Sequence, residues 1–185
     1  MIPLLLFLAA CDGGDAPESG CTGACGCEAT VDVGGTSYDG DGRPIWVEMP
    51  AGSDQTMVHG PQGGWHVLAA ARVQGTAEVV SIEYTIEYPA REAQLSYGLF
   101  RVMLVAESEC GGYYPSMFGI LDVAALAAGD ADTPPELLGG EELLLRMDVD
   151  DGEGGKASDE VTVVAALDPQ DAGDTGETGA PDSGE

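Results

Sequence analysis

Apolar and polar residues alternate along the middle of the chain, and this alternation predicts β-strands. In the segment Val79–Tyr88 the even-numbered residues are all apolar, and the odd-numbered residues from Ser81 to Glu87 are all polar. The segment Trp65–Gln74 carries apolar residues at every odd position from Trp65 to Val73. A period of two is typical of a half-buried antiparallel strand, with one face on the core and the other in solvent.

Shorter alternating runs complete the set of predicted strands, at residues 29–33, 45–47, 95–106, 116–123, 143–149 and 161–166. Gly, Pro and Asp separate these runs. About seven short strands with turn residues between them predict an all-β protein, an antiparallel two-sheet β-sandwich. Residues 122–129 and 134–138 are alternatively predicted as short helical turns.

The chain divides into four predicted parts. Residues 1–10 form an apolar run typical of an export signal, and the run is too short to cross a hydrocarbon core of roughly 30 Å. Residues 11–27 are rich in Gly, Asp, Pro, Ser and Cys and read as a tether, residues 28–167 hold the β-sandwich domain, and residues 168–185 form an acidic tail. The composition of the tether and the tail predicts disorder at both ends.

The run ends in Leu8-Ala9-Ala10-Cys11, which closely resembles the lipobox of bacterial lipoproteins. The resemblance implies cleavage before Cys11, acylation of its thiol and attachment to a membrane through that lipid. It also implies a location in the bacterial cell envelope, with the outer membrane or cell surface favoured over the inner membrane.

A second resemblance concerns residues 140–152 followed by 156–163, which look like the final hairpin of immunoglobulin-like and PKD-like extracellular modules. In such modules an alternating strand ending in Val-x-Asp-x-x-Gly turns into a return strand rich in Ala and Ser. The resemblance covers about the last quarter of the domain. It implies an immunoglobulin-like sandwich and says nothing about a ligand.

Charge narrows the classes of partner. The chain holds 33 acidic and 6 basic residues, for a formal net charge of −27. Repulsion from phosphates argues against nucleic acid and against electrostatic binding to an anionic bilayer. The same charge keeps surface-tethered copies soluble and apart.

Besides Cys11, the chain holds Cys21, Cys25, Cys27 and Cys110, and an exported protein meets an oxidising compartment. We therefore predict two disulfides. A bond between Cys25 and Cys27 would close a small, strained ring. The favoured pairing is Cys21 with Cys25 and Cys27 with Cys110, and the alternative is Cys21 with Cys27 and Cys25 with Cys110. A four-cysteine zinc site would need paired C-x-x-C motifs, which the spacing lacks.

The segment Met57–His66 holds both histidines of the chain on either side of a Gly-Pro-rich turn, and it resembles segments of uncharacterised secreted bacterial proteins. Such a turn would bring His59 and His66 toward one copper or zinc ion, with Met57 as a soft third ligand. The favoured interpretation is that Trp65 anchors the sandwich and the histidines lie on the surface, because a metal site normally needs three or four ligands. The closely spaced Cys, His and Met ligands of cupredoxins are absent.

A second candidate metal site is the acidic turn formed by Asp148, Asp150, Asp151, Glu153 and Asp159. Dense carboxylates offer the six to eight oxygens that Ca²⁺ prefers. An EF-hand is excluded because Glu153 stands where the loop needs Gly. The alternative is that Asp and Gly simply form the turn.

The sequence lacks the catalytic motifs G-x-S-x-G and H-E-x-x-H and the phosphate-binding Gly-Lys-Ser/Thr loop. We therefore predict a non-catalytic, lipid-anchored envelope module without a cofactor, which binds an unknown protein or envelope partner or has a structural role. The alternative is an envelope protein that binds copper or zinc through His59 and His66, or calcium through the Asp148–Asp159 turn.

Overall fold

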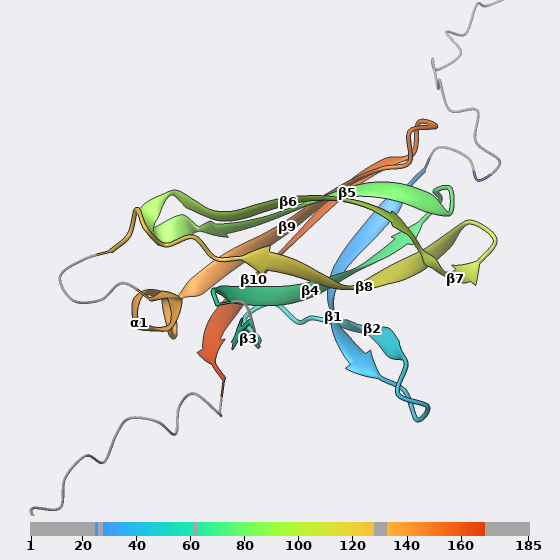
Figure 1. The fold of residues 1–185 in the computed structure, drawn as a ribbon. Helices are drawn as coiled ribbons and strands as arrows, with labels where there is room; N and C mark the ends of the chain where they lie inside the picture. The colour runs from blue at the N-terminus through green and yellow to red at the C-terminus, as the bar shows by residue number, and fades with distance from the viewer. Residues whose placement is uncertain (1–24, 26–27, 61–62, 128–132, 169–185) are drawn as a thin grey trace, which may run out of the picture.

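The computed structural model describes Cys25 and residues 28–60, 63–127 and 133–168, which form a body made almost wholly of β-strands (Figure 1). The strands are β1 (Thr30–Tyr38), β2 (Pro44–Glu48), β3 (Asp54–His59), β4 (Trp65–Gln74), β5 (Val79–Tyr88), β6 (Ala93–Met103), β7 (Val105–Ser108), β8 (Gly111–Ile120), β9 (Glu142–Asp150) and β10 (Lys156–Leu167). Two short helices, η1 (Pro89–Arg91) and α1 (Pro134–Leu138), join them. Neither helix is long enough and apolar enough to cross a membrane, and the described residues contain no other helix that could do so. The all-β prediction is confirmed, whereas the predicted disordered ends lie outside the described residues.

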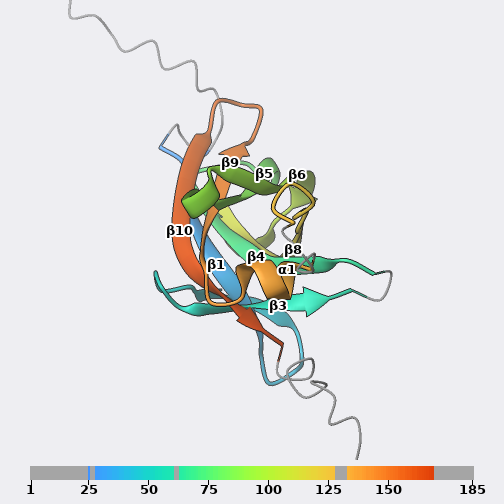
Figure 2. The same ribbon diagram turned by 90° about the vertical axis from the view of Figure 1, so that its left-hand side faces the viewer.

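The strands form one hydrogen-bonded sheet that curls so that two layers face each other (Figures 1 and 2). The strand order is β2-β1-β4-β3-β10-β9-β5-β6, with β8 beside β4 and β7 beside β8. Strand β10 links the layers, because it pairs antiparallel with β9 over 156–164 and parallel with β3 over 164–167. We call β6, β5, β9 and the start of β10 the β9 layer, and β1, β4, β8 and β3 the β4 layer.

The core lies between the two layers and consists of the side chains that alternation predicts to face inward. Ile82, Tyr84 and Ile86 of β5 are fully buried, and so are Val67 and Val73 of β4. Strand β9 adds Leu143, Leu145 and Met147 from the neighbouring position. Removing such side chains from water stabilises the fold by roughly 25 cal/mol per Å² of buried apolar surface. Burial of the apolar faces of the strands therefore holds the two layers together.

The structure refines several strand boundaries. The predicted strand 95–106 is divided at Leu104 into β6, which pairs with β5, and β7, which pairs with β8. Strand β3 was not predicted, since it has a single buried residue, Met57, and therefore no visible alternation. Strand β8 begins at Gly111, earlier than its apolar residues indicate.

The two predicted helical turns have different outcomes. Residues 134–138 form α1, which begins with Pro134 after a capping box in which Thr133 and Glu136 exchange side-chain and backbone hydrogen bonds. The described part of 122–129 is a turn rather than a helix, with the Asp122 side chain accepting a hydrogen bond from the Ala124 amide (3.0 Å).

Candidate functional site

A groove of about 720 Å³ lies on the outer face of the β9 layer. Four strands supply most of its lining: Val79, Ser81 and Glu83 from β5, Leu99 and Arg101 from β6, Asp148 and Asp150 from β9, and Lys156 and Ser158 from β10. Asp151 and Gly152 of the β9–β10 turn also line it. Three of the predicted candidate metal ligands, Asp148, Asp150 and Asp151, therefore share a groove with residues of β5, β6 and β10.

Strand register explains why these side chains meet. Residues directly opposite one another in antiparallel strands point to the same face, so each row of cross-strand partners becomes a line of neighbours. One row runs through Leu99, Glu83, Asp148 and Ser158. The next row runs through Arg101, Ser81, Asp150 and Lys156. The groove is thus apolar and basic along β6, mixed along β5 with one acid, Glu83, and acidic along β9.

Hydrogen bonds keep the β9 carboxylates of the groove ionised. Asp148 accepts a hydrogen bond from Arg146 Nε (3.0 Å) and another from the Ser158 hydroxyl, and these two bonds lower the pKa of Asp148, the Arg146 bond most strongly. Asp150 accepts from Lys156 Nζ (2.6 Å) and from the Gly152 amide (2.7 Å), and the Lys156 bond is the main cause of the lowered pKa of Asp150.

Asp151 has a structural role in two turns. Its carboxylate accepts hydrogen bonds from the amides of Glu153 (2.8 Å) and Gly155 (2.9 Å) in its own turn and of Ala77 (3.2 Å) in the β4–β5 turn. Burial raises the pKa of Asp151, but the three amide donors together outweigh that effect, and the pKa is lowered. This carboxylate therefore joins the β9–β10 turn to the β4–β5 turn.

The calcium hypothesis gains no support from this geometry. The oxygens of Asp148, Asp150 and Asp151 already accept hydrogen bonds, and Asp159 accepts from the Val33 amide (2.8 Å). Within the described ranges, no three His, Cys, Asp or Glu side chains are gathered in a way that would hold a metal ion. The Asp and Gly residues make the turn, as the alternative interpretation proposed.

The two histidines lie on opposite faces of the β3–β4 hairpin. The two strands are joined at Gly60 and Gly64, where the Gly60 amide donates a hydrogen bond to the Gly64 carbonyl (2.9 Å). His59 is opposite Trp65 with ring centroids 5.0 Å apart, whereas His66 is opposite Val58 and Ile120. Burial and the charge of His59 lower the pKa of His66.

The structure also removes the third ligand proposed for copper. Met57 is fully buried in the core, so its thioether is unavailable to an ion at the turn. The imidazole of His66 instead packs edge-on against Phe118, with ring centroids 5.3 Å apart. The hairpin therefore lacks the convergent ligand set that the copper or zinc hypothesis needs.

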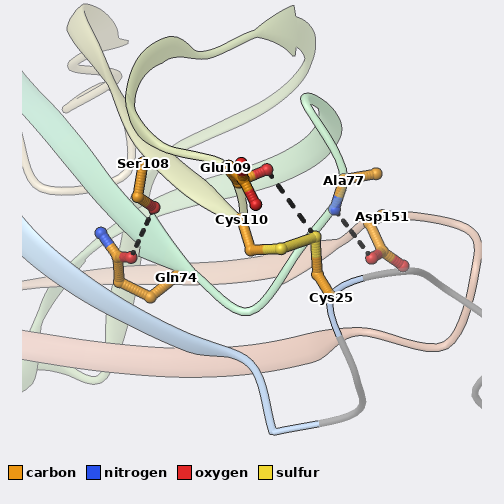
Figure 3. The surroundings of a disulfide bond; sticks show 7 residues. All are labelled: Cys25, Gln74, Ala77, Ser108, Glu109, Cys110 and Asp151. Atoms are coloured by element: carbon orange, nitrogen blue, oxygen red, sulfur yellow. Dashed lines mark hydrogen bonds between the residues drawn. A yellow bond between two sulfur atoms is a disulfide. The ribbon is translucent and has the colours of Figure 1, made fainter.

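A disulfide joins Cys25 to Cys110, with the two Cα atoms 5.3 Å apart (Figure 3). The favoured prediction, which pairs Cys27 with Cys110, is therefore wrong. The structure has the Cys25–Cys110 bond of the alternative pairing. Strand β1 begins beside Gln74, and Glu28 lies against Gly75, whose amide donates to the Cys110 carbonyl (2.7 Å). Glu28 is thus already close to Cys110, which spacing alone does not show. Cys21 and Cys27 lie outside the described residues.

No known protein-family model matches the chain. No curated protein matches it either. Among solved structures, the chain is similar to the CooA pilin subunit from enterotoxigenic Escherichia coli. The two share 15% sequence identity over 76% of this chain and 99% of the pilin chain, with a TM-score of 0.36.

The sequence indicates the acidic residues of the groove but does not indicate that Leu99 and Arg101 of β6 lie beside them. Glu83 and Ser81 were placed on the outward face of β5 by alternation, but nothing in the sequence joins them to Leu99 and Arg101 of β6. The available signal is that β6 is apolar at both odd and even positions, as in Tyr97, Leu99 and Phe100. A strand with apolar residues on both faces cannot bury both against one core, so one face is left for another contact.

Proposed function

We propose that this protein is a non-catalytic, lipid-anchored module of the bacterial cell envelope that binds an envelope partner. The observation that carries the proposal is the Cys25–Cys110 disulfide, which fastens the segment following Cys11 to the folded body. Such a bond suits the oxidising compartment to which the export signal directs the chain. The resemblance of Leu8-Ala9-Ala10-Cys11 to a lipobox supplies the anchor.

In this proposal the disulfide sets where the body sits relative to the membrane. Thirteen residues lie between Cys11 and Cys25, so the span between lipid and disulfide is at most about 50 Å. The end of the sandwich that holds Cys110 is then the end nearest the membrane. Two or more acyl chains hold such a protein stably, whereas a single chain gives only marginal membrane residence.

Membrane fractionation in the bacterial host tests the proposal. We expect the wild-type chain in the membrane fraction, with an intact mass that shows a lipid on Cys11 as the N-terminal residue. Cys11→Ser should release the protein from that fraction or leave it unprocessed. Cys21→Ser is the matched control and should stay membrane-bound. An unmodified Cys11 in the wild-type protein would refute the lipid anchor.

A further inference from the structure

The β6 side of the groove exposes apolar side chains on the outer face of the sandwich. Tyr97 is 57% exposed, Leu99 61% and Met103 62%, and Val79 of the neighbouring strand β5 is 37% exposed. Val79 and Leu99 are both part of the groove lining. Strand β6 ends the strand order, and among the described strands it pairs with β5 alone. These side chains form an apolar strip that the fold itself does not cover.

The opposite side of the groove is acidic. The lining carboxylates, Glu83, Asp148, Asp150 and Asp151, outnumber the lining cations, Arg101 and Lys156. The ion pair between Lys156 and Asp150 is largely exposed, with side-chain exposures of 71% and 44%. Exposed ion pairs of this kind contribute little to stability, so an incoming cation can replace Lys156 at little cost.

We propose that this groove docks a cationic, amphipathic peptide segment of a protein partner. The apolar side chains of the segment pack on Val79 and Leu99, and its Lys or Arg side chains pair with Glu83 and Asp148. A carboxylate has about four acceptor sites, and Asp148 uses three of them for two bonds from Arg146 and one from Ser158, so one site is left for the partner. The proposal names the partner of the binding module proposed above and rests on that function.

Charge selects this occupant over the other candidates. A second copy of the chain brings the same net charge of −27, and the two bodies repel each other. Anionic lipid headgroups are repelled for the same reason. A basic segment is attracted at long range and is then held by burial of the apolar strip, which is the usual division between steering and affinity in interfaces.

A synthetic amphipathic peptide of lysine and leucine is the probe. The full chain carries Cys11→Ser, so that no lipid competes for the leucines, and binding is measured by fluorescence anisotropy with NMR mapping. We expect saturable one-to-one binding, with the largest shifts in β5, β6, β9 and β10. Replacing the lysines by glutamate or the leucines by serine should abolish binding.

Paired variants separate the groove from general attraction to an acidic protein. Leu99→Ser should weaken binding about tenfold, whereas Ile120→Ser, an equally exposed apolar residue on the β4 layer at 67%, should leave it unchanged. Asp150→Asn should weaken binding more than Asp41→Asn, although both changes remove one charge and one ion pair, with Lys156 and Arg43 respectively. The dispersion of the amide signals in the NMR spectrum of each variant confirms that it is folded.

Two outcomes would overturn the proposal. Equal effects of the groove variants and their controls would show that net charge alone attracts the peptide. A dimer of the unbound protein that Leu99→Ser dissociates would show that a second copy occupies the strip. Neither outcome affects the lipid on Cys11 or the fractionation of the wild-type chain, so failure of this inference is distinguishable from failure of the proposed function.

Discussion

The two ends of strand β4 differ in how they are joined to the rest of the fold. A disulfide and an acidic turn lie at the Gln74 end, and the turn with the two histidines lies at the Trp65 end. At the Gln74 end, the Cys25–Cys110 bond, Gly75 and the Asp151 carboxylate join β1, the β4–β5 turn, β8 and the β9–β10 turn. Figure 3 shows Asp151 and the disulfide on either side of the β4–β5 turn. At the Trp65 end, a glycine turn carries two histidines that face away from each other.

The two ends contain similar types of residue but differ in how many distant segments of the chain they join. Each end offers potential metal ligands near glycines, but Asp151 at the Gln74 end also accepts a hydrogen bond from the Ala77 amide of a distant turn. At the Trp65 end, His59 packs against Trp65 and His66 packs against Phe118. We therefore expect substitutions at the Gln74 end to cost stability and substitutions at the Trp65 end to cost little.

The largest expected effect is loss of the disulfide. The bond closes a separation of 85 residues, for which chain entropy gives about 4 to 5 kcal/mol, an upper value because strain and residual structure reduce it. Cys25→Ser and Cys110→Ser should lower the free energy of unfolding by the same amount, measured by urea denaturation without reductant. Cys21→Ser and Cys27→Ser should cost less, and protease sensitivity of the C-terminal tail should hardly change. A Cys27→Ser variant as unstable as Cys25→Ser would mean that Cys27 is the partner of Cys110.

A matched pair of glycines gives the next effect. Gly75 and Gly64 both have positive φ, at 72° and 86°. A Cβ on Gly75 would lie 2.2 Å from the backbone oxygen of Glu28, whereas one on Gly64 meets nothing within 4 Å. Gly64→Ala therefore carries only backbone strain of about 1 to 2 kcal/mol, and Gly75→Ala adds a collision for a total of about 3 kcal/mol or more. Equal shifts in thermal unfolding would contradict the close approach of β1 to the β4–β5 turn.

Spacing and alternation predict most of the fold and little of the way its ends are joined. The buried faces of β4 and β5 follow from a period of two, because one core takes one face of each strand. The partner of Cys110 depends on where Glu28 lies beside Gly75, which is a contact between distant segments. Met57 looked like an available ligand because β3 lacks alternation, and its burial follows from the pairing of β3 with both β4 and β10.

Removal of the Asp151 carboxylate should have an intermediate effect. Asp151→Ala leaves the amides of Ala77, Glu153 and Gly155 without this acceptor, and we expect a loss of about 2 kcal/mol. Asp150→Ala breaks mainly an exposed ion pair and should cost clearly less than Asp151→Ala. Urea denaturation of the two variants at neutral pH measures the difference, and equal losses would show that the amides of the turn find water instead.

The same carboxylate predicts a pH dependence. The pKa of Asp151 is lowered in the folded protein from its ordinary value of 3.8, so folding favours the ionised form. Its contribution is present above that ordinary value and is lost as the pH falls through the lower folded pKa. Wild type should therefore lose stability in that acid range more steeply than Asp151→Ala. Parallel stability curves for the two proteins would show that Asp151 does not titrate with folding.

The smallest effects should come from the histidines. His59→Ala and His66→Ala should each change the free energy of unfolding by no more than about 0.5 kcal/mol, because each loses only a ring contact near the surface. NMR titration gives the sharper measurement, since burial and the charge of His59 lower the pKa of His66 below its ordinary value of 6.5. His59→Ala removes the second cause and should raise the pKa of His66 part of the way back. Because the folded state disfavours the charged imidazole, His66 stabilises the fold above that ordinary value, and this small contribution is lost as the pH falls through the folded pKa. An unchanged pKa of His66 in His59→Ala would mean that the two rings do not sense each other across the hairpin, and burial alone would then account for the shift.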